Sequence, residues 1–108
     1  MSQIEFSMAA RLDRRKITIN AAEFSGVDFA RRLQGSLKST LSMLADYPLA
    51  GHTWKELDPP DHSFRYYSVM GRFIIVYQPV DKGIRVARIL NGLQPLASEL
   101  DNESGGRD

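Results

Sequence analysis

The sequence predicts a small α+β domain in the order strand, helix, helix and three further strands, with the helical hairpin packed on one face of a small antiparallel sheet. Three observations lead to this class. One long segment has apolar residues at helical spacing, three later segments alternate or are apolar throughout, and the two kinds of segment are separated along the chain. Because two short helices cover only one sheet face, we expect the other face to be open to solvent or to a partner.

The composition is that of one ordinary soluble domain. Of the 108 residues, 43% are hydrophobic and 25% are charged, with a net charge of +1. The chain has no cysteine, which excludes disulfides and thiolate sites and suits a reducing compartment. The first residues show no signal-peptide pattern, and the longest apolar run is too short to cross a bilayer. We therefore expect a cytoplasmic bacterial protein, with a single domain over residues 1–100 and a disordered tail over residues 101–108.

The N-terminal part predicts a short strand and then a helix. Ile4 and Phe6 alternate with polar residues, as in a strand. A helix is expected over residues 7–24. The residues predicted to face the core from this helix are Met8, Leu12, Ile19 and Ala22. The basic run R-L-D-R-R-K at 11–16 is then a solvated helix face or, alternatively, a contact surface.

The second helix has the clearest periodicity in the chain. Ser25 is predicted to cap its start, with Asp28 reaching back in a variant of the capping box. Pro48 should end the helix near Tyr47, because proline disfavours helical geometry in the residue before it. The residues expected on its buried face are Phe29, Leu33, Leu37, Thr40, Leu41 and Leu44.

A connection marked by proline and glycine is expected over residues 48–63, before the remaining strands. The strands are predicted over residues 64–69, 73–78 and 84–90, joined by two hairpin-type turns. Residues 95–100 are expected to form one helical turn.

The last predicted strand carries an arginine on each side. We expect Ile84, Val86 and Leu90 to face the helices, with Arg88 as a structural arginine near the rim of the sheet. Arg85 and Asn91 should then lie on the open face. For the arginines as a group, the alternative is a cationic surface that binds a partner.

Three segments after the helical hairpin carry a family resemblance. They are L-A-D-Y-P-L-A-G (44–51), F-R-Y-Y-S-V-M-G-R-F-I-I-V-Y-Q (64–78) and I-R-V-A-R-I-L-N-G (84–92). The motif positions within them are Leu44, Pro48, Gly51, Arg65, Gly71, Arg72, Phe73, Tyr77 and 88–92. In order and spacing they resemble the ParE, or plasmid-stabilisation, branch of the RelE/ParE superfamily of bacterial toxins, over about residues 3–98. Asn91 stands where that family often has histidine, which removes a candidate general base.

The resemblance implies a RelE/ParE-like fold and one of two activities. RelE-like members cleave messenger RNA in the ribosome, whereas ParE-like members poison DNA gyrase. Carried over by position, the nuclease residues would fall near Arg65, Tyr67, Ile74, Gln94 and Leu100. Only Arg65 is basic, and RNA cleavage needs groups that transfer protons and balance the phosphate charge. Toxins of this family are typically neutralised by an antitoxin whose disordered C-terminal segment folds across the helices and sheet.

We therefore predict a ParE-type toxin of a type II toxin–antitoxin system. It inhibits DNA gyrase when free and forms a hetero-oligomer with its cognate antitoxin. We expect no enzymatic activity of its own, no cofactor, and no membrane or direct nucleic-acid partner. One alternative is an endoribonuclease with a rearranged site built from Arg65, Arg72 and Arg88. Another is an inactive relative that only binds the antitoxin.

The candidate partner-binding residues are Arg65, Tyr67, Arg72, Arg85, Arg88 and Trp54. For Trp54 the alternative is packing over the end of the helical hairpin, since tryptophan is common both in cores and at binding hot spots. His52 and His62 lie ten residues apart without cysteine partners, so we expect no metal site.

Overall fold

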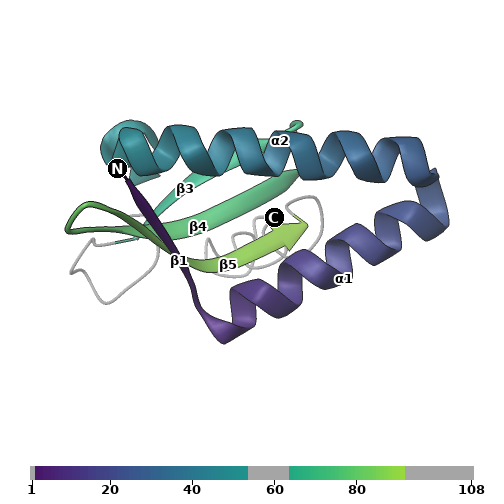
Figure 1. The fold of residues 1–108 in the computed structure, drawn as a ribbon, viewed down its shortest axis with the longest axis horizontal. Coiled ribbons are helices and arrows are strands. Elements are labelled where there is room, and N and C mark those ends of the chain that lie inside the picture. The colour runs from purple at the N-terminus through teal and green to yellow at the C-terminus, as the bar shows by residue number, and fades with distance from the viewer. Residues whose placement is uncertain (1, 54–63, 92–108) are drawn as a thin grey trace, which may run out of the picture.

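The computed structural model describes residues 2–53 and 64–91, and its element order confirms the predicted fold class. The elements are β1 (Gln3–Phe6), α1 (Met8–Ser25), α2 (Val27–Asp46), the short 3-10 helix η1 (Pro48–Ala50), β2 (His52–Thr53), β3 (Arg65–Val69), β4 (Phe73–Val80) and β5 (Gly83–Asn91). Figure 1 shows α1 and α2 as two arms that meet at one end, with β4 and β5 running between them. The helical turn expected at 95–100 and the tail at 101–108 lie outside the described residues.

The five strands form one mixed sheet in the order β1-β5-β4-β3-β2. Strands β3 to β5 pair antiparallel, as predicted, and the two-residue strand β2, which lies within the connection expected at 48–63, pairs antiparallel with β3; β1 runs parallel to β5. Parallel neighbours need a long connection, and here the two helices and the remaining strands separate β1 from β5 along the chain. The antiparallel prediction is therefore correct for β3, β4 and β5 and wrong for β1, because four residues do not specify the direction of their partner.

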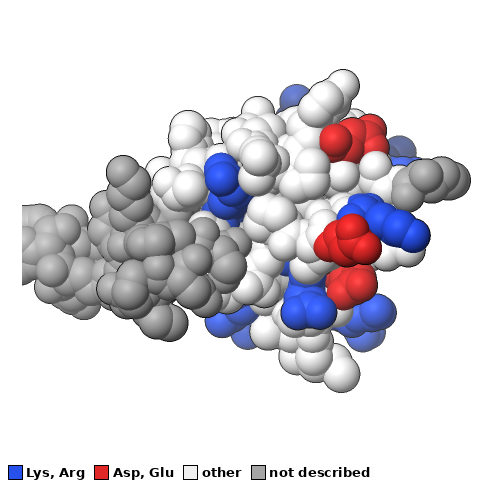
Figure 2. Space-filling view, turned by 90° about the vertical axis from the view of Figure 1, so that its left-hand side faces the viewer, with Lys and Arg blue, Asp and Glu red and all other residues white. Residues whose placement is uncertain are grey.

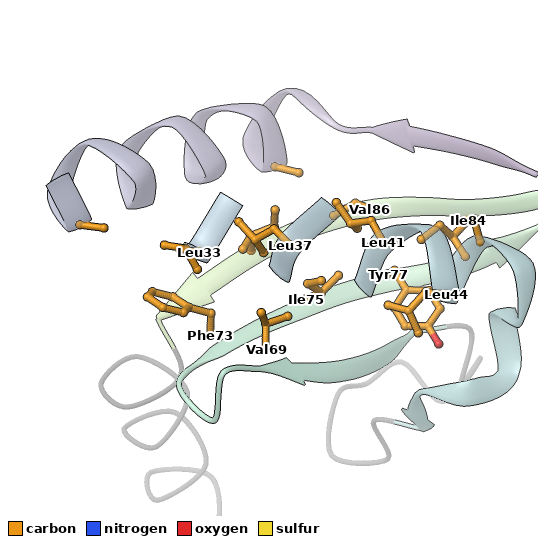
Figure 3. Close-up of a cluster of buried hydrophobic side chains, with 14 of the residues drawn as sticks. Leu33, Leu37, Leu41, Leu44, Val69, Phe73, Ile75, Tyr77, Ile84 and Val86 are labelled. Atoms are coloured by element: carbon orange, nitrogen blue, oxygen red, sulfur yellow. The ribbon is translucent and has the colours of Figure 1, made fainter. Parts of the chain in front are cut away.

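Helix α2 supplies much of the core, on the face that its periodicity predicts. Its buried residues are Ala30, Leu33, Leu37, Leu41, Leu44 and Ala45, while Phe29 and Thr40 are half-buried. The leucines lie against strand residues that include Val69, Ile75 and Ile84 (Figure 3). Burial of each large aliphatic side chain contributes roughly 1.5–3 kcal/mol, so this interface fixes α2 on the sheet.

The junction between the helices differs from the prediction. Ser25 is the last residue of α1, and Gly26 is the cap residue of both helices. Gly26 has a φ of 96°, a conformation that favours glycine. No side chain caps α2, so the predicted capping box of Ser25 and Asp28 is wrong: a one-residue junction keeps Ser25 within the first helix. The end of α2 at Asp46, followed by Tyr47 and Pro48, is as predicted.

Helix α1 buries small residues and exposes large ones, contrary to the prediction. Ala10 and Ala21 are buried, and of the predicted core residues only Ala22 packs against the core. The exposed residues are Met8 (73% exposed), Leu12 (58%) and Ile19 (50%). Positions 8, 12 and 19 share one side of a helix, opposite positions 10 and 21. The periodicity correctly groups Met8, Leu12 and Ile19 on one side of the helix. That side faces outward, because the small side chains of Ala10 and Ala21 let the other side of α1 lie close to β5 and α2.

A bulge interrupts the pairing of β4 with β5. The register steps by one residue, and Ala87 is the residue left without a partner across the strands. Ser7 holds this bulge: its amide donates to the Val86 carbonyl at 3.0 Å, and its hydroxyl donates to the Ala87 carbonyl at 2.7 Å. The same hydroxyl accepts the Ala10 amide at 3.0 Å, so one side chain caps α1 and fixes the bulge.

The bulge decides which residues of β5 face the helices. Ile84 and Val86 do so, as predicted, but after the bulge Ile89 takes the next inward position. Leu90 packs on the opposite face, and Asn91 lines a hollow beside α1. The predictions for Leu90 and Asn91 are wrong because one extra residue reverses the alternation of a strand.

The sheet face away from the helices, here the distal face, is apolar at its centre. Ile74 is 6% exposed and Val76 is 4% exposed. Half-buried hydrophobic residues surround them: Phe64, Tyr66, Ala87 and Leu90. The centre of this face is therefore shielded from solvent, contrary to the expectation of an open face.

Candidate partner-binding surfaces

Arg65 holds the segment that follows α2. Its guanidinium donates to the Gly51 carbonyl at 2.8 Å and to the Leu49 carbonyl at 3.3 Å. Tyr77, its partner on β4, donates to the Pro48 carbonyl at 2.7 Å and accepts the Gly51 amide at 2.9 Å. Four positions of the family motif therefore form one structural unit, and Arg65 is engaged in it.

Tyr77 is fully buried, and burial raises the pKa of its hydroxyl above the ordinary value of 10.0. The hydrogen bond from the Gly51 amide and the charge of Arg65 oppose this rise. Since the hydroxyl also donates to Pro48, its protonated form is the one that fits the folded state.

Arg88 lies at the rim of the sheet and binds Asp13 of α1. The arginine Nε to Asp13 Oδ2 distance is 2.7 Å, and Nη2 to Oδ1 is 3.0 Å. Asp13 Oδ2 also accepts the Ile89 amide at 3.0 Å. Strand β1 pairs with β5 only as far as Val86. Beyond that point, the Asp13 carboxylate accepts the hydrogen bond of the Ile89 amide at this edge of β5. Arg88 is thus held by an ion pair, as expected of a structural arginine, but it pairs with Val76 of the distal face, so the side of the strand predicted for Arg88 is wrong.

The pKa of Asp13 reflects these contacts. Burial alone would raise the pKa of the carboxyl, but hydrogen bonds from Arg88 and the Ile89 amide outweigh it, together with the charges of Arg88 and Lys16. The pKa of Asp13 therefore lies below its ordinary value of 3.8. The carboxylate remains ionised at neutral pH and joins α1 to β5.

Arg85 lies near the start of β5. Arg72 lies beside the other end of β5, because the next residue, Phe73, pairs with Asn91. Arg85 is on the distal face, where its Nε lies 3.3 Å from Oε1 of Glu5, and both side chains are about half exposed. Arg72 is in the turn between β3 and β4, with its guanidinium 5.3 Å from the ring centroid of Phe73. Together with the positions of Arg65 and Arg88, this shows that the predicted arginines do not form a single cluster.

Like the arginines, the residues at the implied nuclease positions are not brought together in one place. Tyr67 packs against the core on the helix side of the sheet, whereas Ile74 is a buried apolar residue of the distal face. Trp54, Gln94 and Leu100 lie outside the described residues. Of the implied set, the described residues therefore bring no general acid or base to the distal face.

The pair His52 and Tyr66 was not anticipated from the sequence. These residues are partners across β2 and β3, with ring centroids 5.2 Å apart. The pair places an imidazole and a phenol at the β2 edge of the sheet. Only the pairing of the two-residue strand β2, for which the sequence gives no clear signal, brings them together.

The outward side of α1 combines apolar and cationic side chains. We call it the α1 outer face, and it consists of Met8, Arg11, Leu12, Arg15, Lys16 and Ile19, all exposed. Two shallow hollows of about 570 and 460 Å³ flank Ile19. Figure 2 shows Lys and Arg surfaces on the lower half of this end of the molecule, where Figure 1 places the start of α1, and also on its upper half, with Asp and Glu surfaces between them.

Two further features concern metal ions and membranes. Within residues 2–53 and 64–91, no group of three or more His, Cys, Asp or Glu side chains is placed to hold a metal ion. In the same residues, neither helix has the length and apolar character needed to cross a membrane.

Comparison with known proteins gives one family and several similar folds. A family model described as the ParE toxin of the type II toxin–antitoxin system, parDE, matches residues 4–95. Among curated proteins, none matches this sequence.

The following three are among the solved structures that share the fold. The chromosomal ParDE TA system from P. aeruginosa is 16% identical, with a TM-score of 0.67 over 84% of this chain and 96% of that chain. The E. coli DinJ-YafQ toxin-antitoxin complex is 20% identical, with a TM-score of 0.57 over 87% and 96%. The conserved hypothetical protein HP0894 from Helicobacter pylori is 18% identical, with a TM-score of 0.53 over 83% and 93%. At these identities the likeness shows the fold, which is the RelE/ParE-like fold predicted from the sequence.

Proposed function

Because this chain belongs to the ParE toxin family of type II toxin–antitoxin systems, we propose that it inhibits DNA gyrase when free and is neutralised by its cognate antitoxin. The observation that carries this proposal is the match to the ParE model over residues 4–95. We place both events in the bacterial cytoplasm, where gyrase acts.

An antitoxin partner has support from the comparisons. Two of the similar structures are of toxin–antitoxin systems, the P. aeruginosa ParDE system and the E. coli DinJ-YafQ complex. A partner also suits the surface of this chain, since large apolar residues of α1 are exposed.

The arrangement of the arginines favours gyrase inhibition over RNA cleavage. A ribonuclease must assemble cations and proton-transfer groups around one phosphate. Here Arg65 is bound to the backbone of residues 49–51, and Arg88 is bound to Asp13. Arg72 lies in a turn at the far end of β5 from Arg85. An inhibitor that acts by binding needs no such assembly.

The test is a supercoiling assay with purified gyrase and relaxed plasmid. We expect the purified chain to reduce supercoiling and an equimolar amount of its antitoxin, the product of the adjacent reading frame, to restore it. A parallel translation reaction should retain its messenger RNA. Full supercoiling together with rapid message loss would contradict the proposal.

One observation favours the ribonuclease alternative. The His52–Tyr66 pair provides two groups that can transfer protons at the edge of the distal face. If the translation reaction does lose message, substitution His52→Ala should abolish that loss under this alternative. If gyrase inhibition is the function, His52→Ala should leave the messenger RNA as intact as the parent protein does.

A further inference from the structure

We propose that a hollow beside the junction of the two helices binds one nucleotide, with the base against phenylalanine side chains and the phosphate at Arg72. This hollow, here the junction hollow, has a volume of about 270 Å³. The lining residues that matter for recognition are Asn20, Phe24, Phe29, Arg72, Phe73 and Asn91. The inference goes beyond the proposed function and does not depend on the gyrase target.

Four element ends meet at the junction hollow. Gly26, with a φ of 96°, joins α1 to α2, so Phe24 near the end of α1 and Phe29 in the first turn of α2 lie on either side of a one-residue turn. On the sheet, Phe73 begins β4 and pairs with Asn91, the last residue of β5. Figure 1 shows β5 running towards the end where the helices meet. The hollow is therefore built from regular elements.

Three phenylalanines give the hollow an aromatic lining. Phe73 is buried and belongs to the core, whereas Phe29 is half-buried. Phe24 is 83% exposed, which leaves its ring available to a ligand. Planar bases stack on aromatic side chains, whatever the base, because every base has a π-face. The volume of 270 Å³ lies just below the usual range of ligand pockets, roughly 300–1,000 Å³, so it suits one small ring system.

The charge of the lining specifies an anionic ligand. Among the described residues that line the hollow, Arg72 is the only one with a charged side chain. Its guanidinium lies 5.3 Å from the ring centroid of Phe73, and an arginine over a ring keeps N–H donors for a second partner. Within residues 2–53 and 64–91, no ion pair occupies this guanidinium. A second cation, Arg32, lies 5.6 Å from the ring centroid of Phe29.

Two carboxamides add hydrogen-bonding groups to the lining. Asn20 on α1 is exposed, and Asn91 at the end of β5 is half-buried. A carboxamide offers both donors and an acceptor, the combination that pairs with the edge of a base. An aliphatic ligand would leave Arg72 and the carboxamides unmatched, and an inorganic anion would leave the phenylalanines unmatched. A nucleotide matches all three parts of the lining.

The test is calorimetric titration of the purified chain with AMP, adenosine, ribose 5-phosphate and a ten-residue oligodeoxyadenylate. We expect AMP to bind with a Kd below about 1 mM. Adenosine and ribose 5-phosphate should each bind about tenfold or more weakly, because each lacks one of the two recognised groups.

The oligonucleotide distinguishes the two sources of a nucleotide. If the site takes an unpaired residue of a DNA strand, the oligonucleotide should bind about tenfold more tightly than AMP, since its phosphates also reach the neighbouring cations. If the site takes a free nucleotide, AMP should bind at least as tightly as the oligonucleotide. Tighter binding of the strand would also correct the expectation that this chain has no direct nucleic-acid partner.

Two variants separate the base from the phosphate. Phe24→Ser should weaken AMP and adenosine alike by about tenfold, because the stacking surface is lost. Arg72→Gln should weaken AMP by about tenfold but leave adenosine within about twofold. The effect of Arg72→Gln should shrink in about 0.5 M salt, whereas that of Phe24→Ser should persist.

Matched controls change the same residue kinds outside the hollow. Tyr47→Ser alters an aromatic residue that is 68% exposed, and Arg15→Gln alters an exposed arginine of α1. Both controls should bind AMP within about twofold of the parent, and thermal unfolding should confirm that every variant is folded.

Three outcomes would overturn the inference. The first is no saturation with AMP up to about 10 mM or with the oligonucleotide up to about 1 mM. The second is equal binding by the parent, Phe24→Ser and Arg72→Gln, which would place the nucleotide elsewhere on the surface. The third is equally tight binding of ribose 5-phosphate and AMP, which would reduce the hollow to an anion site. The supercoiling assay decides the proposed function separately, whichever of these results is found.

Discussion

Asp13 and Arg88, 75 positions apart in the sequence, form a two-point hydrogen-bonded ion pair that joins the first helix to the last strand. Asp13 also accepts the Ile89 amide, so three hydrogen bonds end on one carboxylate. This carboxylate accepts a backbone amide at the edge of β5, beyond the last residue that pairs with β1. The same contacts fix the rotation of α1 about its axis. The outward direction of Leu12, the neighbouring residue, follows from that rotation.

Substitution Asp13→Ala should lower the free energy of unfolding by about 1–3 kcal/mol, because it removes the acceptor of the Ile89 amide and the carboxylate that binds Arg88. Arg88→Ala should cost less, because Asp13 retains the Ile89 amide and the Arg88 side chain is 51% exposed. Urea denaturation of the two variants checks this order. A larger loss for Arg88→Ala would show that the ion pair matters more than the strand edge.

Stability should also depend on the ionisation of Asp13. Its pKa in the folded state lies below 3.8, so folding favours the ionised carboxylate. The stabilisation is complete well above pH 3.8 and is lost as the pH falls from that value through the folded-state pKa. Denaturation midpoints of the parent and Asp13→Asn, measured from pH 6 to pH 2.5, should converge at the acid end. A constant difference between the two proteins across this range would contradict the role given to Asp13.

Much of the fold could be predicted because its elements carry local signals. The leucines of α2 recur at helical spacing, and the apolar strand β4 is bounded by turn residues, so both elements appear where expected. Direction and register are less visible in the sequence. The parallel pairing of β1 and the bulge at Ala87 depend on contacts with Ser7 and with β5, which are distant in sequence.

The candidate site was harder to predict than the fold. The arginines were correctly placed on strands and turns, but their partners were not predictable from spacing: Arg65 binds backbone carbonyls, and Arg88 binds a helix residue. The apolar stripe of α1 was found by its periodicity and assigned to the core, because periodicity does not distinguish a stripe that meets the sheet from one that meets a partner. Exposure of Leu12 and Ile19 is the observation that corrects this.

Substitution Tyr77→Phe should lower the free energy of unfolding by about 1–3 kcal/mol, since the Gly51 amide and the Pro48 carbonyl lose their buried partner. The pKa of Tyr77 is raised in the folded state, so its contribution is complete below pH 10.0 and is lost as the pH rises through the folded-state value. The parent should therefore lose stability above pH 10 more steeply than Tyr77→Phe. Parallel alkaline titrations of the two proteins, followed by circular dichroism, would refute this if their midpoints moved together.

Substitution Gly83→Ala should break the pairing of β1 with β5. A Cβ at Gly83 would overlap the Gln3 carbonyl oxygen, which is backbone and cannot move without displacing the strand. Gly35→Ala is the matched control, because nothing lies within 4 Å of its Cβ and alanine favours a helix over glycine by about 0.5–1 kcal/mol. Thermal unfolding should show a lower Tm for Gly83→Ala and an equal or higher Tm for Gly35→Ala. An unchanged Tm for Gly83→Ala would mean that β1 contributes little to the fold.

Two leucines of the helical hairpin should differ strongly in how much their substitution by alanine lowers stability. Leu33 is fully buried between α2 and the sheet, so Leu33→Ala should cost about 2–5 kcal/mol through lost burial and the cavity that remains. Leu12 is 58% exposed, so Leu12→Ala should change stability by no more than about 0.5 kcal/mol. Both can be measured by urea denaturation of the chain alone. A loss above 2 kcal/mol for Leu12→Ala would place that residue in a core, and the α1 outer face would then lose its central apolar residue as a binding contact.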